Sequence, residues 1–359
     1  MDASRLRAEF PVLARLAFLN AGTDGPLPAR AVAAAAAELE RELQDGRAKE
    51  HFERRSELSD RLRALYAGVL GCDATEVSLT TSATEGIAAV MIGLPLGLGD
   101  EIVTSDEEHP GLQGALAAAR ELRGVEVRAV PFADVAEAVG PRTRLVACSH
   151  VSWMTGRLAP AALAEVDVPV LLDGAQGAGA VPTDVRTLGC DAYAAAGQKW
   201  CCGPDGSGFL YVSPELRERL EVPRRGYGNL EDANAGLAAG LRDDGRRFDS
   251  PALSAEANAC ALASLELLAE EGWDQIHERA AALASRLAEQ LAERGSVVQP
   301  RDRTTLVSFS CADAEQERAL LAESGVVVRN IPGRPWLRAS VGAWNDETDL
   351  ARLLAALRA

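Results

Sequence analysis

The chain has 359 residues, of which 47% are hydrophobic and 25% charged, and its formal net charge is −16. A chain of this length can bury a substantial core and exceeds the usual size of one compact domain, so we expect one larger and one smaller domain. The acidic surface repels phosphates, which disfavours nucleic acid and anionic membranes as partners. No segment resembles a signal peptide or a membrane span, so a cytoplasmic protein is expected.

The cysteines carry no pattern of a metal or redox site. There are seven of them, an odd number, and no two form a Cys-x-x-Cys pair. We therefore expect no metal ion and mostly reduced thiols in the core.

Helix-like and strand-like patterns alternate from about residue 60 to residue 230. The first predicted elements are a helix over 56–70, a strand over 76–80 and a helix after Thr84. Further strands are predicted over 101–104, 125–130, 144–148 and 168–172. Strands separated by helices need crossover connections, which indicates a mainly parallel sheet and an α/β fold.

The pattern changes after about residue 250, beyond a Gly-rich polar stretch that is typical of a surface loop. The predicted elements are helices over 255–271 and 273–294, strands over 305–310 and 337–341, and a helix over 347–357. We expect a large domain over residues 16–245, and a small α+β domain formed by residues 1–15 and 246–359.

Ligands of open α/β sheets collect at the carboxyl ends of the strands. At one such end, the segment TTSATEG (residues 80–86) runs from a strand into a helix, where free N–H groups and the Thr84 hydroxyl favour an anion. An ordinary helix cap explains the same residues. His109 follows the strand over 101–104, where a histidine can stack on an aromatic ring, carry a proton or simply be exposed.

Asp173 ends the apolar run VPVLLD, so its carboxylate lies at the mouth of the sheet and needs a cationic or hydrogen-bonding partner. A protonated pyridine nitrogen is such a partner and makes a cofactor ring an electron sink. A capping Asp at a turn is the simpler alternative. Gln176 is close enough in the chain to reach the same ligand.

Lys199 lies between a short apolar strand and a glycine-rich turn, with few charges nearby. Partial loss of hydration lowers the pKa of such an amine and makes it a nucleophile towards aldehydes. The neighbouring Cys201 and Cys202 are expected to be structural.

The ordered set TTSATEG, EEHP, SHVSWMTG, DGAQ, GQKW and GPDGSGFLYV resembles the class V aminotransferases, including the cysteine desulfurases, among the fold type I pyridoxal-phosphate enzymes. The resemblance extends from FLNAG at residues 18–22 to RASVGAWNDETD at residues 338–349. It implies a mainly parallel, seven-stranded type of sheet flanked by helices, a small C-terminal domain, pyridoxal 5′-phosphate as cofactor, and a homodimer.

The resemblance also implies roles for individual residues. Lys199 matches the lysine that forms the Schiff base with the cofactor and later moves the α-proton of the substrate. Asp173 matches the carboxylate on the pyridine nitrogen. Gln176 matches the donor to the phenolic oxygen of the ring, and His109 matches the histidine that stacks on it.

The phosphate and carboxylate sites follow from the same resemblance. Thr84, with the backbone amides of Ala83 and Thr84, matches the phosphate-binding segment, and Arg338 matches the arginine that binds the substrate carboxylate. Gln198 stands where relatives often have histidine, and offers a neutral amide to the phosphate instead. Ser250 is the candidate replacement for a Gly-Thr pair that contacts the phosphate across the dimer.

Two departures from the family bear on the reaction. Trp153 replaces an asparagine near the ring oxygen, which predicts a bulkier and more apolar pocket edge beside the substrate. Residues 326–338 contain no cysteine, which disfavours a persulfide-relay desulfurase, and Cys311 lies earlier in a predicted strand.

The predicted function is therefore transamination of a small L-amino acid through an external aldimine and a quinonoid. β-Elimination, including carbon–sulfur lysis, and epimerisation are alternatives within the same family. A homologue that binds the cofactor or an amino acid without turnover is the alternative from a different class.

Overall fold

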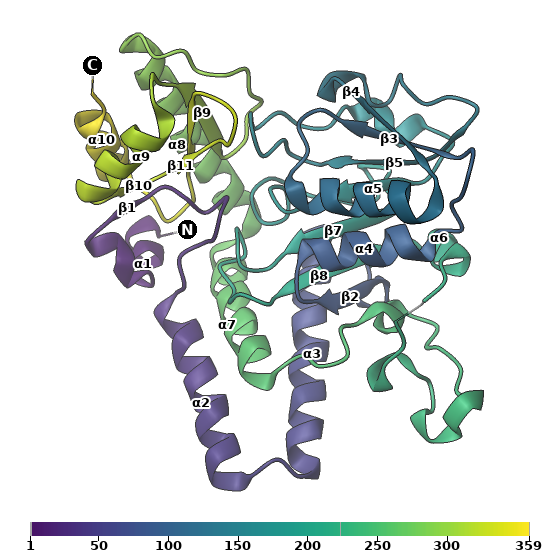
Figure 1. Ribbon diagram of the computed structural model, residues 1–359. Coiled ribbons are helices and arrows are strands. Elements are labelled where there is room, and N and C mark those ends of the chain that lie inside the picture. The colour runs from purple at the N-terminus through teal and green to yellow at the C-terminus, as the bar shows by residue number, and fades with distance from the viewer. Residues whose placement is uncertain (1, 223, 359) are drawn as a thin grey trace.

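The computed structural model describes residues 2–222 and 224–358, and a seven-stranded sheet lies at its centre (Figure 1). The order of strands is β2-β8-β7-β6-β5-β3-β4. Their bounds are β2 (Val77–Thr80), β3 (Glu101–Ser105), β4 (Glu126–Val130), β5 (Thr143–Ser149), β6 (Val170–Asp173), β7 (Ala192–Ala196) and β8 (Gly208–Val212). β8 runs antiparallel to both of its neighbours, and the other adjacent pairs are parallel. The predicted mainly parallel α/β fold is confirmed.

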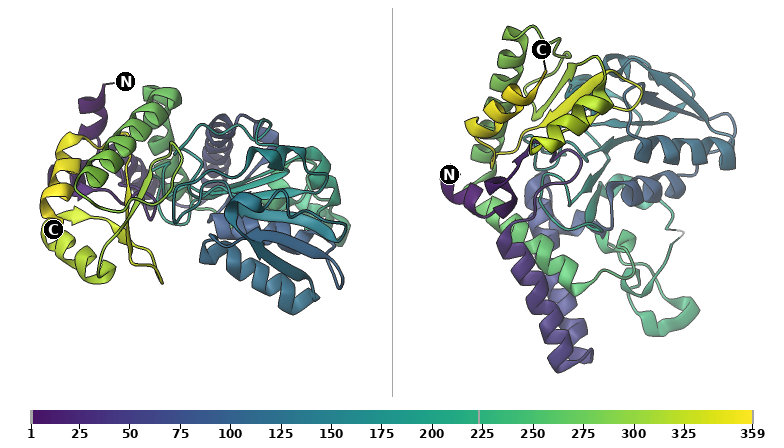
Figure 2. Two further views of the ribbon diagram at one scale, coloured as in Figure 1. Left: turned by 90° about the horizontal axis from the view of Figure 1, so that it is seen from above. Right: turned by 60° about the vertical axis from the view of Figure 1, so that its left-hand side comes forward.

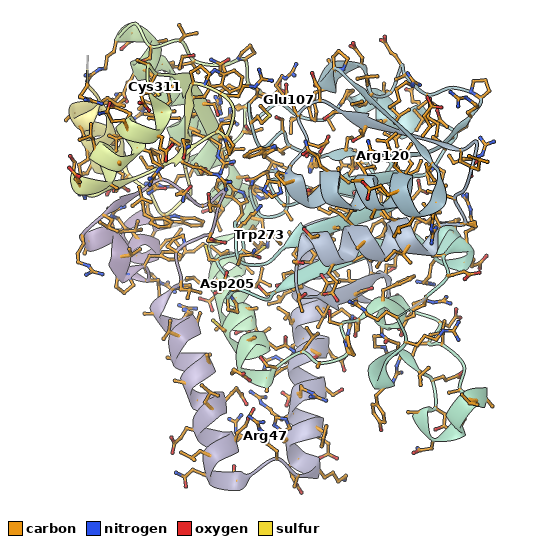
Figure 3. All side chains as sticks on the ribbon, in the orientation of Figure 1. Arg47, Glu107, Arg120, Asp205, Trp273 and Cys311 are labelled. Carbon is orange, nitrogen blue, oxygen red and sulfur yellow. The ribbon has the colours of Figure 1, made fainter. Side chains whose placement is uncertain are left out.

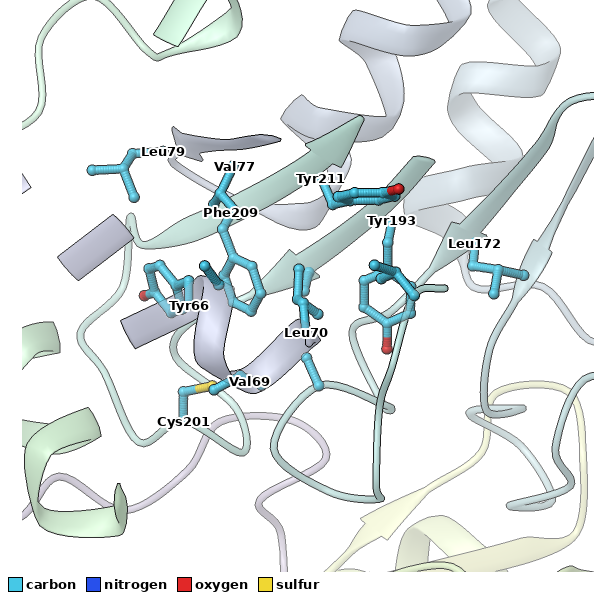
Figure 4. Packing of buried hydrophobic residues seen from close by; sticks show 14 of the residues in the cluster. Tyr66, Val69, Leu70, Val77, Leu79, Leu172, Tyr193, Cys201, Phe209 and Tyr211 are labelled. Atoms are coloured by element: carbon cyan, nitrogen blue, oxygen red, sulfur yellow. The ribbon is translucent and has the colours of Figure 1, made fainter. Parts of the chain in front are cut away.

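Apolar side chains cover both faces of this sheet, as expected for parallel strands. Because successive residues of a strand point to opposite faces, Leu171 and Leu172 of β6 enter two different hydrophobic clusters. The helices that flank the sheet are α3 (Lys49–Leu70), α4 (Ala83–Gly93), α5 (Pro110–Arg123) and α6 (Pro214–Arg219). On the α3 side, the rings of Tyr66 and Phe209 stack with their centroids 3.9 Å apart (Figure 4).

The C-terminal part forms a second, smaller layer beside the large sheet, and both chain ends lie there (Figures 1 and 2). Its strands β9 (Leu306–Ser310), β11 (Arg329–Asn330) and β12 (Trp336–Ser340) form an antiparallel sheet in the order β11-β12-β9. Its helices are α8 (Trp273–Glu293), α9 (Ala314–Glu323) and α10 (Glu347–Ala356), with α1 (Ala3–Ala8) nearby. β1 (Ala17–Phe18) pairs in parallel with β10 (Val326–Val327), so the N-terminal segment joins this layer. The domain boundaries stay a prediction.

The helix α2 (Ala29–Asp45) runs beside α3, and the two extend away from the sheet as a hairpin (Figure 1). The helix α7 (Ala255–Glu271) packs against both of them. The helix α2 was given no bounds from the sequence, and its start has no capping side chain. The helix α3 was predicted to begin seven residues late, at residue 56 instead of Lys49. Among the described residues, no helix is both long and apolar enough to cross a bilayer.

Candidate functional site

The predicted site lies at the carboxyl ends of three neighbouring strands. Ser149 at the end of β5 pairs with Asp173 at the end of β6, and Asp173 pairs in turn with Ala194 of β7. Lys199 follows β7 by three residues and interacts electrostatically with Asp173. The parallel ladder therefore brings together two residues that the sequence analysis had singled out separately.

Lys199 is one of only two lysines in the chain, and it is partly buried. Burial lowers the pKa of its amine to about 8, although the negative charge of Asp173 opposes the shift. The charges of Arg338 and Arg329 lower the pKa of this amine further. With a pKa of about 8, about a tenth of the amine is neutral at pH 7, roughly a few hundred times the fraction expected at the ordinary lysine value. The neutral amine is the form that attacks an aldehyde.

Asp173 is 5% exposed, and its Oδ1 atom accepts a hydrogen bond of 2.9 Å from the backbone N–H of Ala175. Burial raises the pKa of this carboxyl, and the positive charge of Lys199 opposes the shift. A buried carboxylate with a single neutral donor needs a cation beside it. Asp173 is therefore placed to hold a proton on a ligand atom.

Gln176 is buried and held from two sides. Its Nε2 atom donates to the carbonyl of Gly22 at 2.7 Å, and its Oε1 atom accepts from the indole N–H of Trp200 at 3.1 Å. The side-chain amide of Gln176 has a second N–H, which remains available for a ligand oxygen. The sequence analysis gave Trp200 no role in the site, since only the tertiary contact reveals it.

Gly22 is a point of close approach between the N-terminal segment and the site. A Cβ atom at this position would lie 2.9 Å from Nη2 of Arg338, 2.9 Å from Oε1 of Gln176 and 2.8 Å from Oγ of Ser340. Only glycine fits there without a shift of these side chains. Gly22 is the last residue of the FLNAG segment that resembles the family, and this close approach explains why glycine stands there.

His109 and Trp153 meet at one edge of the site, with their ring centroids 5.1 Å apart and their planes at 87°. His109 Nδ1 accepts a hydrogen bond of 3.1 Å from the N–H of Gly111, which leaves the proton of a neutral ring on Nε2. Burial lowers the pKa of His109 to about 4, with smaller contributions from the charges of Lys199 and two arginines. The imidazole is therefore neutral at neutral pH.

Arg338 is fully buried and only partly hydrogen-bonded. Its Nη1 atom donates to the carbonyl of Trp153 at 2.8 Å, whereas Nε and Nη2 have no hydrogen-bond partner among the described residues. Burial, together with the charge of Arg329, lowers the pKa of Arg338 to about 9. Two unused donors on one buried guanidinium fit the two oxygens of a carboxylate.

Arg329 is a site residue that the sequence analysis passed over. It is the register partner of Arg338 across the β11-β12 pair, so both side chains start from the same face of that sheet. Its guanidinium lies 5.5 Å from the ring centroid of Trp153, and Nη1 donates to Oγ1 of Thr23 at 3.3 Å. The hairpin pairing could have found it, because it places residues 329 and 338 opposite each other.

The start of α4 forms the remaining wall of the site. Ala83 packs with Ala175 and Ala196, so small side chains separate the strand ends from the helix. The hydroxyl of Thr84 lies close to the start of α5, since a Cβ at Gly111 would meet its Oγ1 at 2.6 Å. The free N–H groups of a helix start suit an anion such as a phosphate.

Gln198 and Ser250, the other two predicted phosphate contacts, are differently placed. Gln198 Oε1 is a buried atom for which the described part of the chain offers no hydrogen-bond partner. Ser250 Oγ donates to Glu85 at 2.5 Å, and Glu85 also accepts from Thr81 and forms an ion pair with Arg224. The Ser250 hydroxyl is thus engaged within its own chain, and its contact across a dimer stays a prediction.

The residues at this site fit pyridoxal phosphate. Lys199 offers an amine of lowered pKa to the aldehyde, Asp173 offers a carboxylate to the ring nitrogen, and the start of α4 offers N–H groups to the phosphate. The buried polar atoms that have no partner in the described structure include several at this place: Arg338 Nε and Nη2, Trp153 Nε1, Gln198 Oε1 and Ser340 Oγ. Such a group of orphaned atoms is typical of a site that a ligand completes.

Comparisons with known proteins agree with this assignment. The family model Aminotransferase class-V matches residues 17–353. Isopenicillin N epimerase of Streptomyces clavuligerus is 30% identical, over 95% of this chain and 94% of that protein. A probable cysteine desulfurase of Pseudomonas aeruginosa is 32% identical, over 82% of this chain and 79% of that protein.

Two solved structures of the protein C-DES are similar over nearly the whole chain. One is the complex of this cystine C-S lyase with its reaction product cysteine persulfide, with a TM-score of 0.89, 28% identity, and coverage of 96% of this chain and 98% of that one. The other is a lysine-to-alanine variant with glycine covalently linked to the pyridoxal-phosphate cofactor, with a TM-score of 0.90, 28% identity, and coverage of 97% and 98%. The chain therefore belongs to the class V aminotransferase family of fold type I enzymes, and its cofactor is pyridoxal phosphate.

Proposed function

We propose that this enzyme removes the α-proton of a small L-amino acid and then breaks a carbon–sulfur bond at the β-carbon. The observation that supports substrate binding at this site is the pair of unused donors on Arg338. Arg338 lies near Lys199, His109 and Trp153. Arg338 binds the substrate carboxylate, and Lys199 faces the α-carbon. Trp153 forms the apolar edge beside the side chain of the substrate.

Pyridoxal phosphate, when bound, supplies an electron sink for the α-carbon. The protein does the rest through three groups. Asp173 keeps a proton on the ring nitrogen, and Arg338 fixes the carboxylate. The amine of Lys199 takes the α-proton, the electron pair of that C–H bond forms a bond between the α- and β-carbons, and sulfur leaves with the pair of the broken carbon–sulfur bond.

Elimination is favoured over a persulfide relay by the position of the cysteines. No cysteine follows Cys311 in the chain, so none lies in the hairpin between β11 and β12 that carries Arg329 and Arg338. Cys311 comes directly after β9, within the C-terminal layer (Figure 3). The similarity to a cystine C-S lyase over nearly the whole chain supports the cleavage of a carbon–sulfur bond.

Epimerisation is the second candidate, supported by the similarity to isopenicillin N epimerase over 95% of the chain. Transamination, which the sequence analysis placed first, starts from the same removal of the α-proton. The three reactions differ only in what happens next: loss of the β-substituent, return of a proton to the α-carbon, or delivery of a proton to the cofactor.

The test is to incubate the holoenzyme with cystine, cysteine and sulfur-free L-amino acids in D₂O. Elimination predicts pyruvate, ammonia and a sulfur product from the sulfur substrates. Deuterium at the α-carbon with inversion and no pyruvate would favour epimerisation, and conversion of the cofactor to its amine form with a keto acid would favour transamination. No exchange of the α-proton with any substrate would withdraw the proposal in favour of a binding protein.

Lys199→Ala is expected to lower the rate by more than about 10³-fold, because the group that carries the α-proton is lost. Lys49→Ala is the matched control, since Lys49 is the other lysine of the chain and forms an exposed pair with Glu53. Borohydride reduction followed by peptide mapping should find the cofactor on Lys199 in the wild-type and control proteins. Cofactor found on Lys49 would contradict the assignment.

We also propose that the enzyme is a homodimer. The helix α2 exposes Val32, Leu39 and Leu43, which are 52%, 50% and 75% accessible and lie on one side of the helix. An apolar stripe of this kind on a projecting hairpin is typical of a contact surface. Sedimentation at micromolar concentration should give twice the mass of the chain, and a monomer would withdraw this proposal.

A further inference from the structure

Glu108 is a second buried acid next to the cofactor site, and the proposed function gives it no role. It is 2% exposed and accepts hydrogen bonds from the hydroxyl of Ser105, from the N–H of Ser149 at 3.1 Å and from the hydroxyl of Ser149 at 2.6 Å. All of these donors are neutral. Among residues 2–222 and 224–358, no Lys, Arg or His nitrogen lies within ion-pair distance of its carboxylate.

Ser149 connects Glu108 to Asp173. It is the register partner of Asp173 in the parallel β5-β6 ladder, and the next residue, His150, donates its backbone N–H to the Asp173 carbonyl at 2.9 Å. The carboxyl of Glu108 therefore binds the residue of β5 that is paired with Asp173 at the end of β6. The buried carboxyls of Glu108 and Asp173 interact electrostatically and therefore resist simultaneous ionisation, and the negative charge of either one favours a positive charge on a ligand of the other.

A cavity gives Glu108 its own contact with solvent. It has a volume of about 240 Å³ and lies between α5 and β4, and its lining includes Asp106, Glu108, Gln113 and Arg120. Arg120 projects from α5 (Figure 3), and Asp106 is also exposed. Neither Lys199 nor Asp173 lines this cavity. A proton can thus reach Glu108 without passing through the substrate pocket.

We propose that Glu108 is a positioning residue that exchanges its proton with solvent through this cavity. The charge of Glu108 thereby sets how strongly Asp173 holds a protonated ring nitrogen. When Glu108 is ionised, its negative charge strengthens the hold of Asp173 on a protonated ring nitrogen. When Glu108 is neutral, that hold weakens. The inference rests on the proposed placement of the cofactor ring against Asp173.

The charged neighbours of Glu108 determine where it titrates. Burial raises the pKa of Glu108 to about 7, the donors Ser105 and Ser149 oppose the shift, and the charge of Asp173 adds to it. Cys148 on β5 also interacts electrostatically with Glu108, but burial keeps the pKa of its thiol well above the usual range. On the cavity side, Asp106 and Arg120 carry opposite charges that partly cancel. His109, the next residue in the chain, is neutral above a pH of about 4.

Glu108→Gln is the informative variant, because it removes the charge and keeps the shape. Its Oε1 accepts from the N–H of Ser149, and its Nε2 donates to the Ser149 hydroxyl, which is also an acceptor. Glu107→Gln is the matched control. Glu107 precedes Glu108 in the same loop, but its carboxylate binds Ser152, Thr155 and Arg157 instead.

The first measurement uses the protein without cofactor. Infrared difference spectra should show a protonated carboxyl that ionises near pH 7 in the wild type and in Glu107→Gln, and is missing in Glu108→Gln. Because the folded state raises the pKa of Glu108, the wild type should lose stability relative to Glu108→Gln as pH rises towards and through about 7. No carboxyl that titrates in this range would overturn the inference.

The second measurement follows the visible absorption of the bound cofactor against pH. The wild type and Glu107→Gln should share a transition near neutral pH that Glu108→Gln lacks. A titrating Glu108 with identical cofactor spectra in all three proteins would overturn the inference and leave the proposed function intact. Absence of a bound-cofactor band in the wild type would instead remove the proposed function.

Ser149→Ala provides a second route if Glu108→Gln does not fold. It removes one donor that stabilises ionised Glu108, so both transitions should move to higher pH by about 0.5–1 unit. Transitions that stay at the wild-type pH in Ser149→Ala would also overturn the inference.

Discussion

Two buried arginines, Arg63 and Arg338, differ in whether the protein itself provides an anion to neutralise them. The first is a structural residue, and the second lies in the candidate ligand site. Arg63 of α3 is 5% exposed and donates to both oxygens of Asp249, at 3.0 and 2.8 Å. Arg338 is 0% exposed and donates to a single backbone carbonyl, with no carboxylate within ion-pair distance in the described structure. A buried guanidinium is stable when an anion neutralises it. The protein supplies that anion for Arg63, and under the proposed function the substrate carboxylate supplies it for Arg338.

The largest expected effect is on stability at the first arginine. Arg63→Ala should lower the free energy of unfolding by about 3–5 kcal/mol, because Asp249 would be left buried without its cation. Urea denaturation at neutral pH measures this change. The double variant Arg63→Met with Asp249→Leu should recover most of the loss, because it removes both charges and keeps apolar volume. A loss below about 1 kcal/mol in Arg63→Ala would mean that the pair contributes no more than a surface salt bridge.

At the second arginine the effect should fall on substrate binding. Arg338→Met should lose about 2–5 kcal/mol of substrate interaction, while the free energy of unfolding stays the same or rises, because an unpaired buried charge is removed. Titration of the holoenzyme with substrate, followed by absorbance, gives the affinity, and urea denaturation gives the stability. Arg338→Lys is the control that keeps the charge and loses the two-pronged geometry. A large loss of stability in Arg338→Met would place Arg338 with Arg63 as a structural residue.

The pH dependence of cofactor capture adds a further test of the ligand-binding part. The rate at which protein without cofactor captures pyridoxal phosphate should rise with pH and level off above about 8, because only the neutral amine of Lys199 reacts. Asp173→Asn should move the midpoint to lower pH, since the charge of Asp173 raises the pKa of Lys199. Stopped-flow absorbance measures both profiles. A midpoint near the ordinary lysine value would show that Lys199 is not desolvated.

The smallest expected effect concerns two buried tryptophans. Trp200→Phe removes the hydrogen bond to Gln176 and should cost about 0.5–1.5 kcal/mol more than Trp344→Phe, because the indole N–H of Trp344 has no partner within residues 2–222 and 224–358. Both side chains are 2% exposed, so the loss of buried ring area is similar. Urea denaturation of the two variants gives the comparison. Equal losses would mean that the hydrogen bond to Gln176 adds nothing to stability.

Regular elements with clear end signals were predictable from the sequence. The helix α7 begins and ends where predicted, because Ser254 caps its start and Gly272 ends it. The strand β3 was predicted to within one residue by its apolar run. The alanine-rich α2 has no capping side chain at its start, and no bounds were predicted for it from the sequence.

The site residues that lie in local sequence motifs could be predicted. Asp173 ends a strand, Lys199 and His109 each follow one, and parallel strands place such residues at one edge. The contacts of Gly22, Trp200 and Arg329 were not predictable, because they arise between segments that lie far apart in the chain. Ser250 shows the same limit, since its bond to Glu85 depends on how the 245–250 segment folds back.

The pairing of β1 with β10 has a consequence for how the protein is made. The chain emerges from the ribosome with its N-terminus first, so Ala17 and Phe18 are outside long before Val326 and Val327 are synthesised. The strands of the large sheet, which are complete by residue 212, can assemble in the meantime. Gly22 reaches its place between Gln176 and Arg338 only when the last tenth of the chain has been added. The nascent enzyme therefore remains without a finished site until translation is nearly over, which delays catalysis until the whole chain is present.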